Sequence, residues 1–101
     1  MTTPQYLMHL QVAIKKTFGN ESKHVETLRV FESFAGKVVF DGEVEVFTIT
    51  GHPSAKRCYA WAKDHETGSD SFVVLERPPI TDALSAVRAV LATIVKRANQ
   101  N

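Results

Sequence analysis

The chain has 101 residues, of which 44% are hydrophobic and 23% are charged. This composition is typical of one globular domain, residues 1–101, and it excludes a fibrous or mainly disordered chain. Twelve basic and eleven acidic residues give a formal net charge of +1. A strong electrostatic attraction to nucleic acid or to an anionic membrane is therefore not expected.

The compartment is indicated by what the sequence lacks. A single cysteine, Cys58, excludes an intrachain disulfide and fits a reducing environment. The first residues have neither the basic nor the apolar region of a secretory signal. The longest apolar stretch, 89–95, has seven residues, whereas a transmembrane helix needs about 20. We expect a cytoplasmic protein that does not enter a membrane.

A first helix is predicted from Pro4 to Phe18. Thr3 can cap its N terminus, Pro4 suits the first helical position, and Gly19 can take the left-handed conformation that ends a helix. One apolar stripe at spacings of three and four consists of Leu7, Leu10, Ile14 and Phe18.

A last helix is predicted from a cap at Thr81 or Asp82 to Ala98. Its apolar stripe includes Leu84, Val87, Leu91 and Ile94. Another face carries the small side chains of Ser85, Ala86, Ala89, Ala92 and Thr93. That face indicates either simple helix propensity or a surface that a second helix can approach closely.

Between the helices the apolar period changes to two, which predicts four strands. They span Val25–Phe34, Val38–Thr50, Arg57–Asp64 and Ser71–Arg77. Asp41-Gly42 is a hairpin signal, but a turn there would align core residues with charges. We therefore predict one continuous strand in which Gly42 marks a bulge or bend. A connection at 35–37 then brings Leu28 opposite Val44 and Phe34 opposite Val38.

The predicted fold is α+β, a single domain of order α-β-β-β-β-α. Hairpin connections imply an antiparallel sheet, and we expect two helices packed on one face. Both faces of the last two strands are non-polar, so a second face would remain open around Phe47, Ile49, Tyr59 and Trp61. We expect two copies of the chain to cover this face as a homodimer.

The residues that could carry chemistry are few. No pair of histidines has the spacing of a zinc site and Cys58 has no second cysteine, so we expect no metal and no cofactor. His52 lies in a predicted turn beside Lys56 and Arg57, where it could contact a ligand or act as an acid or base. The alternative is an exposed turn histidine. No nucleophile with its base is recognisable, so no catalytic residue is assigned and an enzyme is not favoured.

Arg57, Tyr59, Trp61 and Lys63 alternate along one face of the third strand. Aromatic and basic side chains on a sheet are typical of single-stranded nucleic-acid platforms. The alternative is a buried or interface pair of aromatics with the basic groups at its ends, and the low net charge favours it.

Two resemblances follow from these segments. The runs Thr50-Gly51-His52-Pro53, Lys56-Arg57-Cys58-Tyr59-Ala60-Trp61 and Pro78-Pro79 resemble a pattern of small uncharacterised bacterial proteins over roughly residues 25–95, which implies no activity. The order helix, sheet, helix also resembles the double-stranded-RNA-binding domain, whose Gly-Pro-x-His loop lies where Gly51-His52-Pro53-Ser54 stands. The order of histidine and proline differs, one strand is additional, and Asp82 stands where that family has lysines.

The function predicted first is a non-enzymatic interaction module that self-associates through the open sheet face. The alternative is a small-ligand-binding protein or minor enzyme with a site near His52, Tyr59 and Trp61. A nucleic-acid-binding domain is the third hypothesis, and it is not favoured.

Overall fold

The structure is a computed structural model and describes residues 3–98. Its elements are α1 (Pro4–Phe18), β1 (Ser22–Phe34), β2 (Lys37–Ile49), β3 (Arg57–His65), β4 (Gly68–Leu75) and α2 (Ala83–Ala98). The strands form one antiparallel sheet in the order β1-β2-β3-β4. The predicted α+β class and the order α-β-β-β-β-α are confirmed.

The caps predicted for the two helices are present in the structure. The Thr3 hydroxyl accepts the backbone N–H of Tyr6 at 3.1 Å, and Gly19 ends α1 with a φ of 77°. At α2 the Asp82 carboxylate accepts the backbone N–H of Ser85 at 2.8 Å, and the Ser85 hydroxyl accepts that of Asp82 at 3.1 Å. This reciprocal pair satisfies amide groups that an isolated helix leaves without partners.

The β1–β2 hairpin differs from its prediction near the turn. Ala35 and Gly36 both have positive φ, 54° and 78°, so the turn has two residues and Phe34 pairs with Lys37 rather than Val38. The register shifts between Glu32 and Ser33 and again between His24 and Glu26. The predicted continuous strand is confirmed. The predicted bulge at Gly42 is wrong, because Gly42 pairs regularly with Val30.

The two helices cover opposite faces of the sheet. Leu10 and Ile14 of α1 pack in a cluster with Phe47, Ile49, Cys58, Ala60 and Leu75. Ala83, Ala86 and Val87 of α2 pack in a second cluster with Val44, Val46, Tyr59 and Trp61. Successive residues of a strand point to opposite faces. The prediction that both helices pack on one face is therefore wrong.

This arrangement explains why β3 is apolar on both sides. Cys58 and Ala60 are small, and they let α1 approach the sheet closely. Tyr59 and Trp61 project from the other side, where the small side chains of α2 receive them. A second helix, rather than a second copy of the chain, accounts for the double-sided pattern. The small-residue face of α2 is partly internal, since Ala86 is fully buried.

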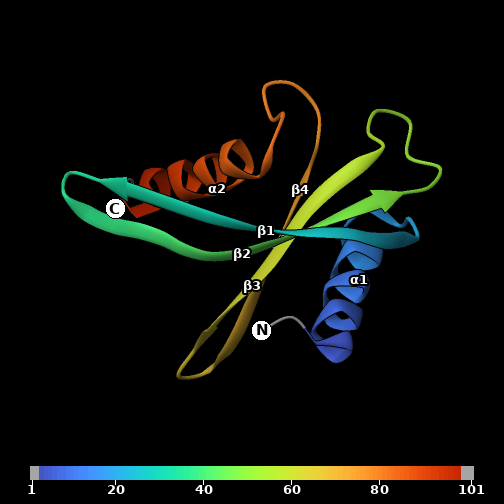
Figure 1. Cartoon of the computed structure of the whole chain (residues 1–101), viewed down its shortest axis with the longest axis horizontal. Coiled ribbons are helices and arrows are strands. Elements are labelled where there is room, and N and C mark those ends of the chain that lie inside the picture. Colours follow the sequence, from blue (N-terminus) through green and yellow to red (C-terminus); the bar gives the residue numbers. More distant parts are fainter. Residues whose placement is uncertain (1–2, 99–101) are drawn as a thin grey trace.

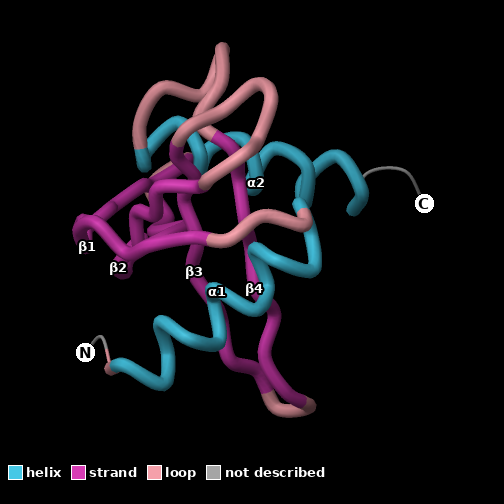
Figure 2. The backbone as a smooth tube through the Cα atoms, turned by 90° about the vertical axis from the view of Figure 1, so that its right-hand side faces the viewer, coloured by secondary structure: helices cyan, strands magenta, loops and turns pink. Residues whose placement is uncertain are grey.

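The sheet divides into two hairpins. β2 pairs with β3 only from Glu45–Thr48 to Arg57–Ala60, whereas β1–β2 and β3–β4 pair over most of their lengths. Figure 1 shows the hairpins crossing and then diverging, with β1–β2 running to the left and β3–β4 running downward. In Figures 1 and 2, α2 lies above this crossing and α1 below it.

Candidate functional site: a cleft between the diverging hairpins

The cleft begins where the β2–β3 ladder stops. Ile49 donates its N–H to the carbonyl of Lys56 at 2.9 Å, so the register would make Glu43 and Ala62 the next hydrogen-bonded pair after Glu45 and Ala60. That pair does not form. Instead, Ala62 donates its N–H to the hydroxyl of Tyr6 on α1 at 2.9 Å. A helix side chain therefore takes the place of a strand carbonyl at the apex of the cleft.

The cavity at this position has a volume of about 580 Å³, within the range of roughly 300–1,000 Å³ common for ligand pockets. One part of its wall is apolar and lies under α2. It consists of Val87, Val90, Leu91 and Ile94 of α2 with Phe40, Trp61 and Phe72 of the sheet. The Trp61 ring stacks on Phe72 with centroids 5.6 Å apart and meets Phe40 edge-on at 5.8 Å. The contacts between the three rings form a continuous apolar part of the wall.

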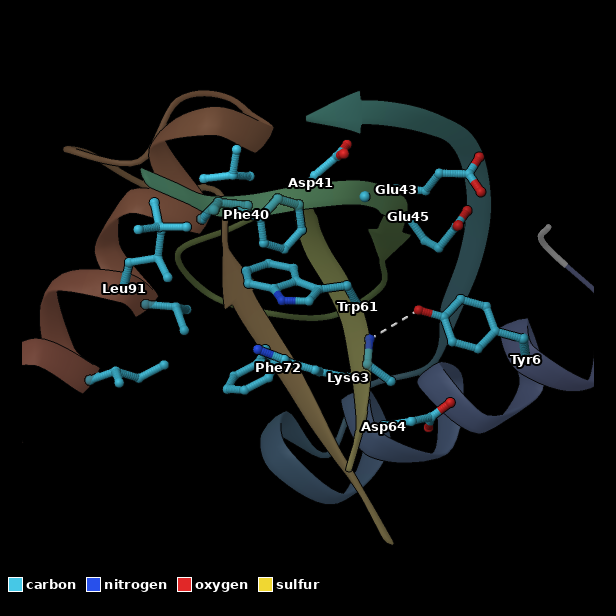
Figure 3. Close-up of a pocket in the computed structure, with 17 residues that line it drawn as sticks. Tyr6, Phe40, Asp41, Glu43, Glu45, Trp61, Lys63, Asp64, Phe72 and Leu91 are labelled. Atoms are coloured by element: carbon cyan, nitrogen blue, oxygen red, sulfur yellow. Dashed lines mark hydrogen bonds between the residues drawn. The ribbon is translucent and has the colours of Figure 1, made fainter. Parts of the chain in front are cut away.

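The opposite part of the wall is acidic. Four carboxylates line it, those of Asp41, Glu43, Glu45 and Asp64, against one basic group, that of Lys63. Figure 3 shows this separation, with Leu91, Phe40 and Phe72 on one side of Trp61 and the carboxylates of Glu43, Glu45 and Asp64 nearer to Tyr6 on the other. Asp41 also forms an ion pair with Arg29 of β1. The cleft is therefore amphipathic.

Glu45 is the innermost of these carboxylates and is fully buried. Its Oε1 accepts a hydrogen bond from the Thr27 hydroxyl and lies 2.9 Å from Nε2 of His24. The His24 ring also meets Phe47 edge-on, with centroids 5.4 Å apart. β1 thus supplies polar partners to a buried carboxylate, and a buried charge needs such partners.

The pKa of the Tyr6 hydroxyl reflects its burial and the negative charges at this end of the cleft. Burial raises its pKa, and the negative charges of Glu45, Asp64 and Glu43 raise it further, against the opposing effect of the Ala62 N–H. Tyr6 therefore stays protonated through neutral pH. Three carboxylates close enough to act on one hydroxyl produce a local field that attracts cations.

The structure does not bring the six candidate residues predicted from the sequence into one site. They are His52, Arg57, Tyr59, Trp61, Phe47 and Ile49. Phe47 and Ile49 lie under α1, whereas Tyr59 and Trp61 lie under α2, and all four are buried. The prediction that they share one open face is wrong, because strand alternation separates them and both helices cover them. Of the six, Trp61 alone lines the cleft.

Tyr59 lies on the face of the sheet that α2 covers, but it does not line the cleft. Its hydroxyl donates to the Glu76 carboxylate and lies 3.4 Å from the carbonyl of Thr81. Burial, followed by the hydrogen bond to Glu76, raises the pKa of Tyr59. Neither Tyr59 nor Trp61 offers an exposed ring face on which a nucleic-acid base could stack.

His52 and Arg57 have structural partners. Nδ1 of His52 accepts the backbone N–H of Ser54 at 3.1 Å and of Ala55 at 3.2 Å, and its ring meets Phe18 edge-on at 6.0 Å. Arg57 reaches Glu26 of β1 at 3.4 Å. His52 therefore stabilises its own turn beside the end of α1, away from the cleft lining.

The remaining chemical groups of residues 3–98 do not form a reactive or metal-binding site. Burial raises the pKa of the Cys58 thiol to about 12, so it is protonated at neutral pH. Within the described part of the chain, no three His, Cys, Asp or Glu side chains gather to hold a metal ion. The absence of a cofactor stays a prediction. Neither described helix is long and apolar enough to cross a membrane.

Comparison of the chain with family models, characterised proteins and solved structures finds no match. The two resemblances noted from the sequence therefore stay predictions. Tyr6, Glu45 and the α2 wall of the cleft were not among the sequence candidates. For Glu45 one signal exists in the strand 38–46, whose acidic face carries Asp41, Glu43 and Glu45 and whose other face is apolar.

Proposed function

We propose that this protein is a non-enzymatic binding module and that the cleft between β2, β3 and α2 is its binding site. Its ligand combines an apolar part with positive charge. The observation that carries this proposal is the early end of the β2–β3 ladder at Glu45 and Ala60, beside a cavity with one apolar and one acidic wall.

The walls define the ligand by their chemistry. Leu91 and Ile94 present apolar surface whose removal from water on binding is favourable by about 25 cal/mol per Å². The carboxylates of Asp64 and Glu43 favour a cation and oppose an anion at the other wall. A ligand with both characters satisfies both walls, and an anionic one satisfies only the first.

The test uses octylammonium and octanoate, which share an alkyl chain and differ in charge. Trp61 is the only tryptophan of the chain, so its fluorescence reports on the cleft directly. We expect octylammonium to shift this fluorescence and to bind about fivefold more tightly than octanoate at low salt. Equal affinity for both would remove the acidic wall from the site, and binding of neither would refute the proposal.

Two variants locate the binding. Leu91→Asp places a charge on the apolar wall at a half-buried position and should abolish the fluorescence response. Val12→Asp adds the same charge on α1, where the side chain is 53% exposed, and should change nothing. Circular dichroism of both variants confirms that the fold is intact. A response that survives Leu91→Asp places the ligand elsewhere.

Self-association is our second candidate, and it needs a surface other than the one first expected. One group of exposed apolar side chains lies near the turn of the β1–β2 hairpin, where Phe34 is 75% and Phe31 58% exposed. Exposed aromatic groups of this size favour association. Sedimentation equilibrium at micromolar concentration should detect a dimer that Phe34→Lys dissociates, and a monomeric native chain would refute the homodimer.

A further inference from the structure

We propose that the cleft receives an extended peptide segment of a partner protein, which adds to the exposed edge of β3 as a β-strand with alternating apolar and basic side chains. This inference rests on the proposed function, because it names the chemical class of the ligand for the same cleft. Three features of the cleft support it: the backbone edge, the two walls and the position of Tyr6.

The edge of β3 has the hydrogen-bonding groups that a strand needs. Glu76 donates its N–H to the carbonyl of Arg57 at 2.9 Å, so the backbone N–H and C=O groups of Arg57 and of alternate residues after it point toward β4. The backbone groups of Ala62 and Asp64 therefore point to the other edge of β3, toward the cleft. β2 has no pair with β3 beyond Ala60 in the described chain. The edge thus offers its N–H and C=O groups to an incoming strand.

The two walls determine the sequence pattern of that strand. A strand beside β3 continues the sheet, and its successive side chains point to opposite faces. On one face they meet the α2 wall at Leu91 beside Trp61, and on the other they meet the exposed carboxylates of Asp64 and Glu43. An apolar side chain suits the first face and a basic side chain suits the second. The period of two in the ligand matches the division of the cleft.

Tyr6 occupies the first bonding position of this edge. Its hydroxyl accepts the Ala62 N–H in the free protein. A carbonyl of the incoming strand would take over this hydrogen bond, so Tyr6 competes with the ligand. Removal of the hydroxyl in Tyr6→Phe frees the amide. We expect the peptide to bind about three- to tenfold more tightly, the equivalent of one net hydrogen bond.

The test compares blocked hexapeptides of three lysines and three valines. In one peptide the two residues alternate, and in its isomer the lysines precede the valines. We expect the alternating peptide to bind at least about tenfold more tightly, since only it satisfies both walls in an extended conformation. Binding is read from the fluorescence of Trp61 and from protection of the Ala62 and Asp64 amides against hydrogen exchange.

Backbone methylation separates strand pairing from side-chain binding. Two versions of the alternating peptide carry N-methyl groups on alternate amides, one set on each edge. Strand addition predicts that one version loses binding and the other keeps it, because only one edge faces β3. Equal binding of both versions, or no gain in Tyr6→Phe, overturns the inference.

The outcomes distinguish this inference from the proposed function. If octylammonium binds and the alternating peptide binds no better than its isomer, the cleft is a site for small amphipathic cations and strand addition is refuted. If no cationic ligand binds, the proposed function fails as well. If the alternating peptide binds with protection of Ala62 and Asp64 and loses affinity in Leu91→Asp, both stand.

Discussion

Ala62 donates its backbone N–H to the hydroxyl of Tyr6 in the position where the register of the sheet would place Glu43. An amide without a partner in a partly buried position costs free energy, so a strand cannot leave its neighbour without a replacement. Tyr6, which comes from the other end of the chain, is that replacement. The contact satisfies the Ala62 amide at the point where the two hairpins diverge.

The first prediction concerns this contact. Tyr6→Phe keeps the ring and removes only the acceptor, so we expect the free energy of unfolding to fall by about 1 kcal/mol. Urea denaturation measures it. Met8→Ala serves as a control on the same helix, since Met8 is 63% exposed, and it should change stability by less than about 0.5 kcal/mol. Equal stability of Tyr6→Phe and the native chain would show that the hydrogen bond has no net value.

Much of the fold could be predicted from local patterns. Thr3 and Asp82 mark helix starts because their side-chain oxygens accept backbone N–H groups, and Gly19 marks a helix end because it takes the left-handed conformation. The pairing of Leu28 with Val44 follows from matching apolar faces. Each of these features depends on residues close in sequence or on a strict period of two.

The side of the sheet on which each helix packs could not be predicted in this way. The apolar stripe on α2 indicates that the helix packs against the sheet, but it does not indicate against which face of β3. The small residues Cys58 and Ala60 and the aromatic pair Tyr59 and Trp61 offered two apolar faces. The sequence pattern favours both helices on one face and a second copy on the other, whereas each face is covered by one helix.

The cleft could not be predicted from the sequence pattern either, because it lies where residue pairs between β2 and β3 do not form. The strands 38–46 and 57–64 have ordinary strand periodicity throughout, and nothing in it marks where their ladder ends. The end depends on the divergence of two twisted hairpins and on Tyr6, which lies 56 residues before Ala62. Only the three-dimensional arrangement brings these together.

The second prediction concerns the buried carboxylate. His24→Ala removes the ring whose Nε2 lies 2.9 Å from Glu45, and it leaves a fully buried carboxylate with one partner fewer. We expect a loss of about 1–3 kcal/mol in the free energy of unfolding. The double variant His24→Ala, Glu45→Leu should recover part of that loss. If the double variant is less stable by the sum of the two single losses, the pair does not interact.

A third prediction tests whether His52 is structural. Its Nδ1 accepts two backbone N–H groups of the turn, from Ser54 and Ala55. His52→Ala should therefore reduce stability by about 1 kcal/mol. His52→Asn retains a side-chain acceptor at a turn position and should lose less. Octylammonium binding should be unaffected by both variants, because His52 does not line the cleft. Loss of binding in both, with the fold intact, would assign His52 to the site.

The fourth prediction concerns the reactivity of Cys58. The side chain is fully buried, and burial raises the pKa of its thiol to about 12. Because the thiolate is the reactive form, the native protein should react with a disulfide reagent at pH 8 far more slowly than the urea-unfolded chain. Absorbance of the released thiol follows both reactions. Equal rates would show that the α1 face opens readily.

The last prediction is a loss of stability at alkaline pH. The ordinary pKa values of the Cys58 thiol and the Tyr59 hydroxyl are 9.0 and 10.0, and burial raises both in the folded protein. Above about pH 9 the unfolded chain therefore releases protons that the folded chain keeps, so folding becomes less favourable as pH rises. The stabilisation is complete below pH 8 and is lost toward pH 12, with a slope of up to about 1.4 kcal/mol per pH unit for each group. Urea denaturation between pH 7 and 10.5 measures the slope. Cys58→Ala should flatten it most between pH 8.5 and 9.5, around the ordinary pKa of the thiol and below that of tyrosine. A slope unchanged in this variant would contradict the assignment to the thiol.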